Sequence, residues 1–102
     1  MINLNEFNVS GEVVSLKELE GEFKSSLIIK GTATREGAET SQILELTCLM
    51  QDKVYKDALQ KGLKRYSKAT VSGHIESWQR VQPNGKVKTK IMFIADYIYD
   101  VA

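Results

Sequence analysis

Residues that cross-link chains or bind metals are nearly missing from this sequence. Among 102 residues there is one cysteine, Cys48, and one histidine, His74. A single cysteine excludes an intramolecular disulfide and fits a reducing cytoplasm. One Cys and one His are also too few for a zinc site built from the usual ligands. We therefore expect neither a metal nor another cofactor.

Long apolar runs are missing as well. The densest, Ile91 to Ala95, is far too short for a membrane-spanning helix. The N-terminal sequence Met-Ile-Asn-Leu-Asn-Glu has neither the basic region nor the apolar stretch of a secretory signal. These absences predict a cytoplasmic protein that makes no contact with a membrane.

The sequence also lacks the motifs of catalysis. It contains no recognisable Ser-His-Asp or Cys-His arrangement, no Gly-rich phosphate loop and no cluster of metal ligands. We expect a protein that is not an enzyme.

What the sequence does contain is an ordinary globular composition with an uneven charge distribution. Its length predicts one domain over residues 1–102, and 42% of the residues are hydrophobic. The net charge is only +1. Residues 1–52 are nonetheless mostly acidic and residues 53–102 mostly basic. This asymmetry indicates one acidic and one basic face, although charges scattered over a solvated surface remain the alternative.

Five segments rich in β-branched residues, with loosely alternating apolar and polar positions, predict five strands. They are residues 7–16, 23–34, 42–50, 68–82 and 86–99. Gly11 predicts a bulge or a sharp bend in the first strand. In the second strand, Leu27 and Ile29 are expected to face inward. The apolar stretch Ile91 to Ile94 predicts a last strand that is buried on both faces or changes sides at a bulge.

A helix is expected between the third and fourth strands. Asp52 has the character of an N-cap, and apolar residues recur at helical spacing up to about Arg65, with Gly62 leaving the end open. The order of elements predicts an all-β fold, a five-stranded Greek-key OB-fold barrel with one short helix between strands three and four. An α+β sandwich is the less favoured alternative, because one short helix could not cover five strands.

The most specific local signal is the segment Gln82-Pro83-Asn84-Gly85-Lys86. Pro83 and Asn84 suit a type I turn and Gly85 suits the left-handed position of a G1 bulge, so a three-residue loop is predicted. Counting outward places Val81 opposite Val87, Arg80 opposite Lys88 and Trp78 opposite Lys90. Directly opposed residues share a face.

Trp78, Arg80, Lys88 and Lys90 are therefore expected on one side of a protruding arm, with Lys86 at its tip. An aromatic face that stacks on any base, ringed by cations that meet phosphates, is typical of single-stranded nucleic acid binding. The alternative is a solvated hairpin whose tryptophan packs on the lysine stems. The predicted DNA-binding residues, including two lysines of the second strand, are Trp78, Arg80, Lys86, Lys88, Lys90, Lys24 and Lys30.

Nearly the whole sequence resembles the bacterial single-stranded-DNA-binding protein family. The resemblance is carried, in order, by Val9-Ser-Gly-Glu-Val-Val14, the stretch from Ile43 to Leu59, Val71-Ser-Gly-His-Ile75, the Asn84-Gly85 turn and Ile94-Ala-Asp-Tyr-Ile98. It implies an OB-fold protein that binds single-stranded DNA, with RNA also possible, in replication, recombination or repair. It also implies a homodimer or homotetramer.

Two departures from the family pattern stand out. Replicative members continue into a Gly/Pro-rich tail with an acidic tip, whereas this sequence stops at Ala102. Positions that hold stacking aromatics on the third strand are here Ile43, Thr47 and Leu49, so only Trp78 remains. The pattern is more similar to a short member such as the tailless, dimeric primosomal protein PriB, or to a phage or mobile-element version. Since OB barrels also serve as docking domains, an OB-fold protein-interaction module is the rival hypothesis.

Overall fold

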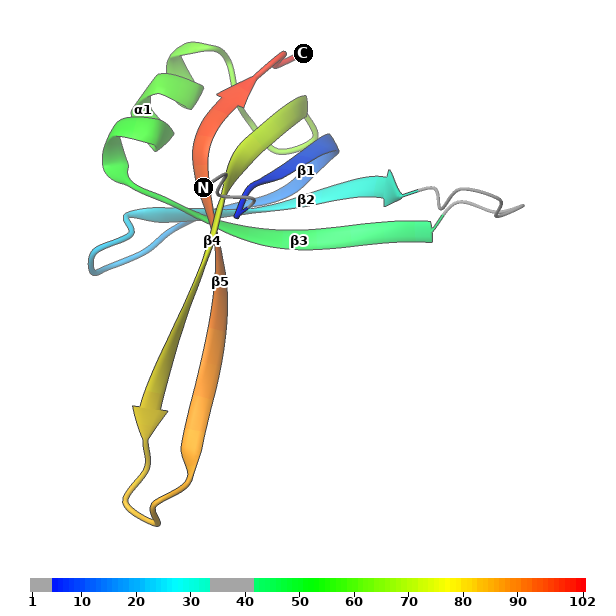
Figure 1. Ribbon diagram of the computed structural model, residues 1–102. Coiled ribbons are helices and arrows are strands. Elements are labelled where there is room, and N and C mark those ends of the chain that lie inside the picture. Colours follow the sequence, from blue (N-terminus) through cyan, green and yellow to red (C-terminus); the bar gives the residue numbers. More distant parts are fainter. Residues whose placement is uncertain (1–4, 34–41) are drawn as a thin grey trace.

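The five expected strands form a closed barrel in the computed structural model, which describes residues 5–33 and 42–102. The elements are β1 (Phe7–Glu18), β2 (Ser25–Ala33), β3 (Gln42–Met50), α1 (Asp52–Gln60), β4 (Lys68–Val81) and β5 (Val87–Tyr99). The strand order is β1-β2-β3-β5-β4, with β4 returning to pair with β1 and with β3 parallel to β5 (Figure 1). This is the OB-fold layout, so the predicted fold class is confirmed. Residues 35–41, which separate the second and third predicted strands, lie outside the described residues.

The core fills the barrel with side chains from alternate strand positions. Its fully buried larger members are Val13, Leu27, Ile29, Cys48, Met50, Val71 and Ile98. Leu27 and Ile29 thus face inward as predicted, while Lys24 and Lys30 are exposed. Cys48 is fully buried, and this burial raises the pKa of its thiol to about 12, which keeps the thiol protonated.

The first strand bends where Gly11 was expected to bend it. β1 pairs with β4 over Phe7–Glu12 and with β2 over Gly11–Glu18, so it passes from one neighbour to the other around this glycine. A Cβ at Gly11 would overlap the carbonyl group of Lys30, and only glycine allows this approach. The bulge itself lies elsewhere, between Val13 and Ser15.

The last strand changes sides at a bulge, which was one of the two predicted arrangements. Ser72 pairs with Tyr97 and Gly73 with Ala95, so Asp96 is an extra residue on β5. Ala95 is buried before the bulge and Ile98 is buried after it. In an unbroken strand, two residues three positions apart would face opposite sides of the sheet, so the extra residue at the bulge is what lets both point into the core.

The helix is shorter than predicted and begins one residue differently. The N-cap is Gln51, in an extended conformation and with no side-chain cap bond, so the assignment of Asp52 as N-cap was wrong. Asp52 instead opens the helix and pairs with Lys56 at 2.9 Å. The helix ends at Gln60 rather than near Arg65, because Gly62 adopts a φ of 94°.

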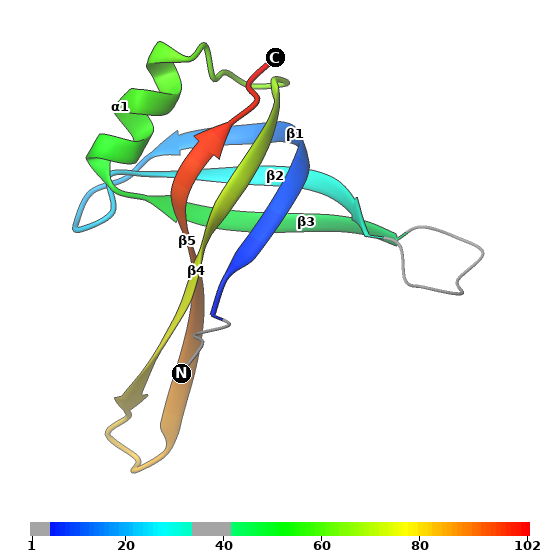
Figure 2. The ribbon, with the colours of Figure 1, turned by 45° about the horizontal axis from the view of Figure 1, so that its top comes forward.

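The helix covers one end of the barrel (Figure 2). Ala58 and the following Leu63 are buried against the core, and the Lys61 ammonium donates a hydrogen bond to the carbonyl of Ile98 at 3.0 Å. Within residues 5–33 and 42–102, no helix is both long and apolar enough to cross a membrane.

Candidate nucleic-acid interface

Strands β4 and β5 run beyond the barrel as a two-stranded arm, which we define as residues 76–92 (Figures 1 and 2). Its tip has the predicted turn. The amide of Gln82 donates to the carbonyl of Lys86 at 2.8 Å, and the amide of Gly85 donates to the carbonyl of Gln82 at 2.9 Å. Gly85 has a φ of 83°, the left-handed conformation of a G1 bulge.

The predicted register of the arm is confirmed at every pair. Val81 lies opposite Val87, Arg80 opposite Lys88, Gln79 opposite Thr89 and Trp78 opposite Lys90. Alternate pairs share a side, so the arm has two faces. The front face is the one that holds the tryptophan, and its residues are Glu76, Trp78, Arg80, Lys86, Lys88, Lys90 and Met92.

The front face continues the outer surface of the barrel. Ile94 pairs with His74 on β4 and with Leu49 on β3, so these three residues share one side of the sheet. Trp78 lies on the same side of β4 as His74, because the two residues are four positions apart. An extended ligand bound to the front face could therefore continue over the outward side of β3 and of its neighbour β2.

Trp78 is held in place yet stays open to solvent. Its side chain is 43% exposed. The indole Nε1–H donates to the sulfur of Met92 at 3.4 Å, and the Nζ of Lys90 lies 5.7 Å from the ring centroid. One edge of the ring is thereby fixed and a cation lies over it, which leaves a positioned aromatic surface at the base of the arm.

The four cations of the front face have no acidic partner within residues 5–33 and 42–102. Arg80, Lys86, Lys88 and Lys90 are exposed, and none forms an ion pair with any residue in the described parts of the chain. Arg80 and Lys88 lie directly opposite each other, an arrangement that costs stability. They line a shallow hollow at the tip together with Gln82, Pro83 and Asn84. Such a hollow offers two positive charges to an anion.

The two lysines predicted from β2 lie apart from the arm. Lys24 closes the β1–β2 loop through its backbone, which bonds Leu19 and Met50, and this loop projects from the barrel in a different direction from the arm (Figure 1). Lys30 lies on the outward side of β2 between Glu12 and Glu45, its direct partners on β1 and β3. The charge of Lys30 is thus locally balanced.

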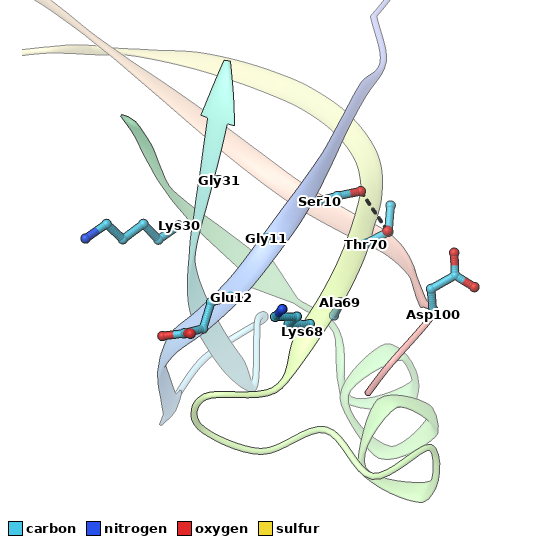
Figure 3. A pocket seen from close by; sticks show the side chains of 9 residues that line it. All are labelled: Ser10, Gly11, Glu12, Lys30, Gly31, Lys68, Ala69, Thr70 and Asp100. Atoms are coloured by element: carbon cyan, nitrogen blue, oxygen red, sulfur yellow. Dashed lines mark hydrogen bonds between the residues drawn. The ribbon is translucent and has the colours of Figure 1, made fainter. Parts of the chain in front are cut away.

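Lys30 also borders a hollow on the outer surface of β1, β2 and β4 (Figure 3). Its charged side chains alternate in sign, because Glu12 is opposed by Lys30 on one side and by Lys68 on the other. Ser10 and Thr70 share a hydrogen bond of 2.8 Å in its wall. This hollow has no excess of positive charge to attract a nucleic acid.

A hydrogen-bonded cluster at the base of the arm went undetected in the sequence, which left the role of His74 open. Its Nδ1 is 2.7 Å from a carboxylate oxygen of Asp96 and its Nε2 is 2.6 Å from one of Glu76. The hydrogen bonds to Asp96 and to Glu76 raise the pKa of His74 above its ordinary value. Asp96 reaches the imidazole from the bulge in β5, and no sequence signal gave the position of that bulge. Among the described residues, no group of three or more His, Cys, Asp or Glu is arranged to hold a metal ion.

Comparison with known proteins gives matches by structure and none by sequence. No protein-family model matches the chain, and no curated protein sequence does. A single-stranded-DNA-binding protein (SSB) of Plasmodium falciparum, solved with ssDNA, is similar with a TM-score of 0.61 and 20% identity over 95% of this chain and 90% of the other.

Two further solved structures are similar over nearly the full length of both chains. A small single-stranded DNA binding protein of Mycoplasma pneumoniae has a TM-score of 0.58 and 17% identity, covering 96% of this chain and 94% of its own. The mitochondrial single-stranded DNA binding protein Rim1 of S. cerevisiae has a TM-score of 0.57 and 11% identity, covering 96% and 95%. At these identities the likeness establishes a shared OB fold.

Proposed function

We propose that this protein binds single-stranded DNA without sequence preference through the front face of the arm. The observation that carries the proposal is the half-exposed ring of Trp78 on the same face as four cations that lack acidic partners among the residues the structure describes. A base stacks on the ring whatever its identity, and the cations meet the phosphates on either side. Such contacts bind and hold a strand, and they carry out no reaction on it.

Lys90 and a stacked base would compete for the tryptophan ring. A cation over an exposed aromatic ring is worth about 0.5–1 kcal/mol, whereas base stacking on an aromatic side chain is worth about 1–3 kcal/mol. Stacking therefore wins, and Lys90 moves to a phosphate when a strand binds. The cation keeps the ring oriented in the free protein without blocking it.

From the arm the strand is proposed to continue over the outward side of β2 and β3, the surface that OB folds commonly use for oligonucleotides. Ile28, Thr47 and Leu49 lie there in place of aromatic rings, and Lys30 is flanked by acids. Stacking is thus concentrated at Trp78, and phosphate contacts supply most of the affinity. Binding should accordingly be modest and should weaken steeply with salt.

The biological setting is part of the proposal. The solved structures that share the fold include one crystallised with ssDNA. We infer a role for this chain in DNA replication, recombination or repair in the cytoplasm, as a homodimer or homotetramer. RNA is a possible second ligand, since stacking and phosphate contacts do not depend on the sugar.

The proposal is tested by replacing Trp78 and a matched aromatic elsewhere. Tyr66 is 63% exposed and has the guanidinium carbon of Arg65 4.8 Å from its ring centroid, so it is a second exposed aromatic beside a cation, but away from the arm. Trp78→Ala should weaken binding of labelled oligo-dT, followed by fluorescence anisotropy, by about 1–3 kcal/mol. Tyr66→Ala should leave it unchanged.

The rival hypothesis is an OB-fold docking module, a primosome-like component, that binds nucleic acid weakly or not at all. It predicts that neither substitution affects oligo-dT binding and that the folded wild-type protein does not retain the oligonucleotide at low salt. Equal losses for Trp78→Ala and Tyr66→Ala would place the stacking site outside the arm.

A further inference from the structure

The arm has a second face that the proposed function leaves unused. This back face consists of Ser77, Gln79, Val81, Val87, Thr89 and Ile91. None of the six carries a charge. Its three aliphatic side chains are largely exposed, at 69% for Val81, 56% for Val87 and 61% for Ile91.

The back face is apolar because it continues the inside of the barrel. Ile75 pairs with Phe93, and Phe93 packs against the core and makes an edge-to-face contact with Phe7 at 5.6 Å. Ser77 and Ile91 form the next pair on the same side, and Val81 and Val87 come further along. The alternation that places apolar side chains on the core side of β4 and β5 thus continues into the arm, where there is no core beneath them.

An uncovered face of this kind is unfavourable for an isolated hairpin. A two-stranded ribbon is marginally stable in water and needs a third strand or another apolar surface to cover it. Here the front face adds repulsion, since Arg80 opposes Lys88 and further lysines flank them. The arm therefore gains stability from a partner on its back face more than anywhere else.

We propose that the back face is a self-association surface, which packs against the back face of the arm of a second copy. Charge decides the partner and the orientation. Two front faces repel each other, whereas two back faces carry no charge, so back-to-back packing buries apolar side chains without desolvating an ion. A two-fold axis makes this contact self-complementary, with Ile91 of one copy against Val81 and Val87 of the other.

Back-to-back packing leaves both front faces open on opposite sides of a two-layered unit, since stacked sheets lie about 10 Å apart. The back face would be the contact surface of the proposed oligomer, and this contact does not require the front face to bind DNA. Five residues of each strand give a contact about 17 Å long. Two strands present a face about 10 Å wide, so the contact covers roughly 170 Å² of each copy. This area is well below the roughly 800 Å² per partner of a standard interface, so the association through the arms alone is weak and depends on protein concentration.

Disulfide trapping tests the contact directly. Cys48 is fully buried with its thiol protonated, so an added cysteine is the only reactive one. Under mild oxidation Thr89→Cys, which lies midway between Ile91 and Val87 and so nearest the two-fold axis, should form disulfide-linked dimers at least about tenfold faster than Lys88→Cys on the front face, because pairing raises the local thiol concentration. Both rates are measured at high salt, which screens the repulsion between two front faces, so that a slower rate at position 88 reports the lack of a contact there. Equal rates would overturn the proposal.

A second measurement removes the apolar groups without changing strand propensity. In the triple variant Val81→Thr, Val87→Thr and Ile91→Thr, each new residue is β-branched and uncharged. Sedimentation should show wild-type protein heavier than 11.5 kDa at high concentration, undiminished by added salt, and the triple variant closer to 11.5 kDa. A wild-type protein that stays monomeric throughout, or a triple variant of unchanged mass, would contradict it.

The two proposals fail separately. Loss of self-association in the threonine variant with oligo-dT binding retained per chain supports the back face as an independent surface. Trp78→Ala should in turn leave the sedimentation of the free protein unchanged, and a drop in mass for this variant would show that the front face carries the contact instead.

Discussion

Strands β4 and β5 are buried at one end and exposed at the other, although one pair of strands forms both ends. Within the barrel, β4 pairs with β1 and β5 with β3, and Val71, Ala95 and Ile98 pack into the core. Within the described residues, neither outer edge of the arm pairs with another strand, and side chains on both faces are exposed. The comparison teaches that the barrel supplies the folding free energy, whereas the arm can carry repelling charges and uncovered apolar groups because the barrel holds its base.

The largest expected effect is the difference in stability loss between a substitution in the barrel and one in the arm. Leu27→Ala empties a fully buried position in the barrel and should lower the free energy of unfolding by about 2–5 kcal/mol. Val81→Ala removes an aliphatic side chain from the arm and should change it by less than about 0.5 kcal/mol at protein concentrations where the chain is monomeric. Urea titration measures both. A similar loss for the two variants would mean that arm and barrel are stabilised alike.

A smaller effect separates two lysines within the arm. Lys88→Ala and Lys90→Ala should each flatten the log–log dependence of oligo-dT affinity on salt by about 0.7, the value for each phosphate of a single strand that the protein no longer neutralises. Lys90→Ala also frees the ring of Trp78, which offsets part of its cost by about 0.5–1 kcal/mol. At a fixed low salt concentration we therefore expect Lys88→Ala to reduce the affinity more.

The matched control for this pair is Lys53→Ala, an exposed lysine on α1. It should leave both the affinity and the salt dependence as in the wild type. A slope change for Lys53→Ala equal to that of Lys88→Ala would show that net charge, and not the front face, sets the binding.

The smallest expected effect lies at the junction of arm and barrel, where His74 bridges Asp96 and Glu76. Because the pKa of His74 is raised in the folded state, its protonated form contributes stability that is fully present below its unfolded pKa of about 6.5. This contribution is lost as the pH rises through the higher folded pKa. The stability difference between wild type and His74→Gln, followed by urea titration against pH, should shrink in that window. A difference that grows with rising pH would contradict the assigned hydrogen bonds.

Features set by residues close together in the sequence could be predicted, and features set by contacts between distant segments could not. The register of the arm was predictable because Pro83, Asn84 and Gly85 fix a local turn and pairing propagates outward from it. A bulge in the last strand was one of two predicted arrangements, but its position at Asp96 was not predictable, since it arises where β5 must curve to close the barrel. The cluster around His74 depends on that bulge and was missed with it.

The remaining site residues show the same limit. Lys30 was predicted as a DNA-binding residue and is exposed, but its position between Glu12 and Glu45 depends on pairing with two other strands that no turn signature defines. Val81, Val87 and Ile91 alternate like core residues, and the sequence does not mark where the core beneath them ends. The barrel and the front face of the arm were thus readable from local patterns, and their surroundings were not.

The most direct test of the proposed DNA binding is a fluorescence titration of the wild-type protein with oligo-dT. Trp78 is the only tryptophan, so the intrinsic signal comes from the front face alone. Stacking predicts saturable quenching at low salt that is reversed as salt is added. Oligo-dT that binds, by anisotropy, without changing this fluorescence would contradict stacking on the arm, and a folded protein that binds no oligo-dT would contradict the function itself.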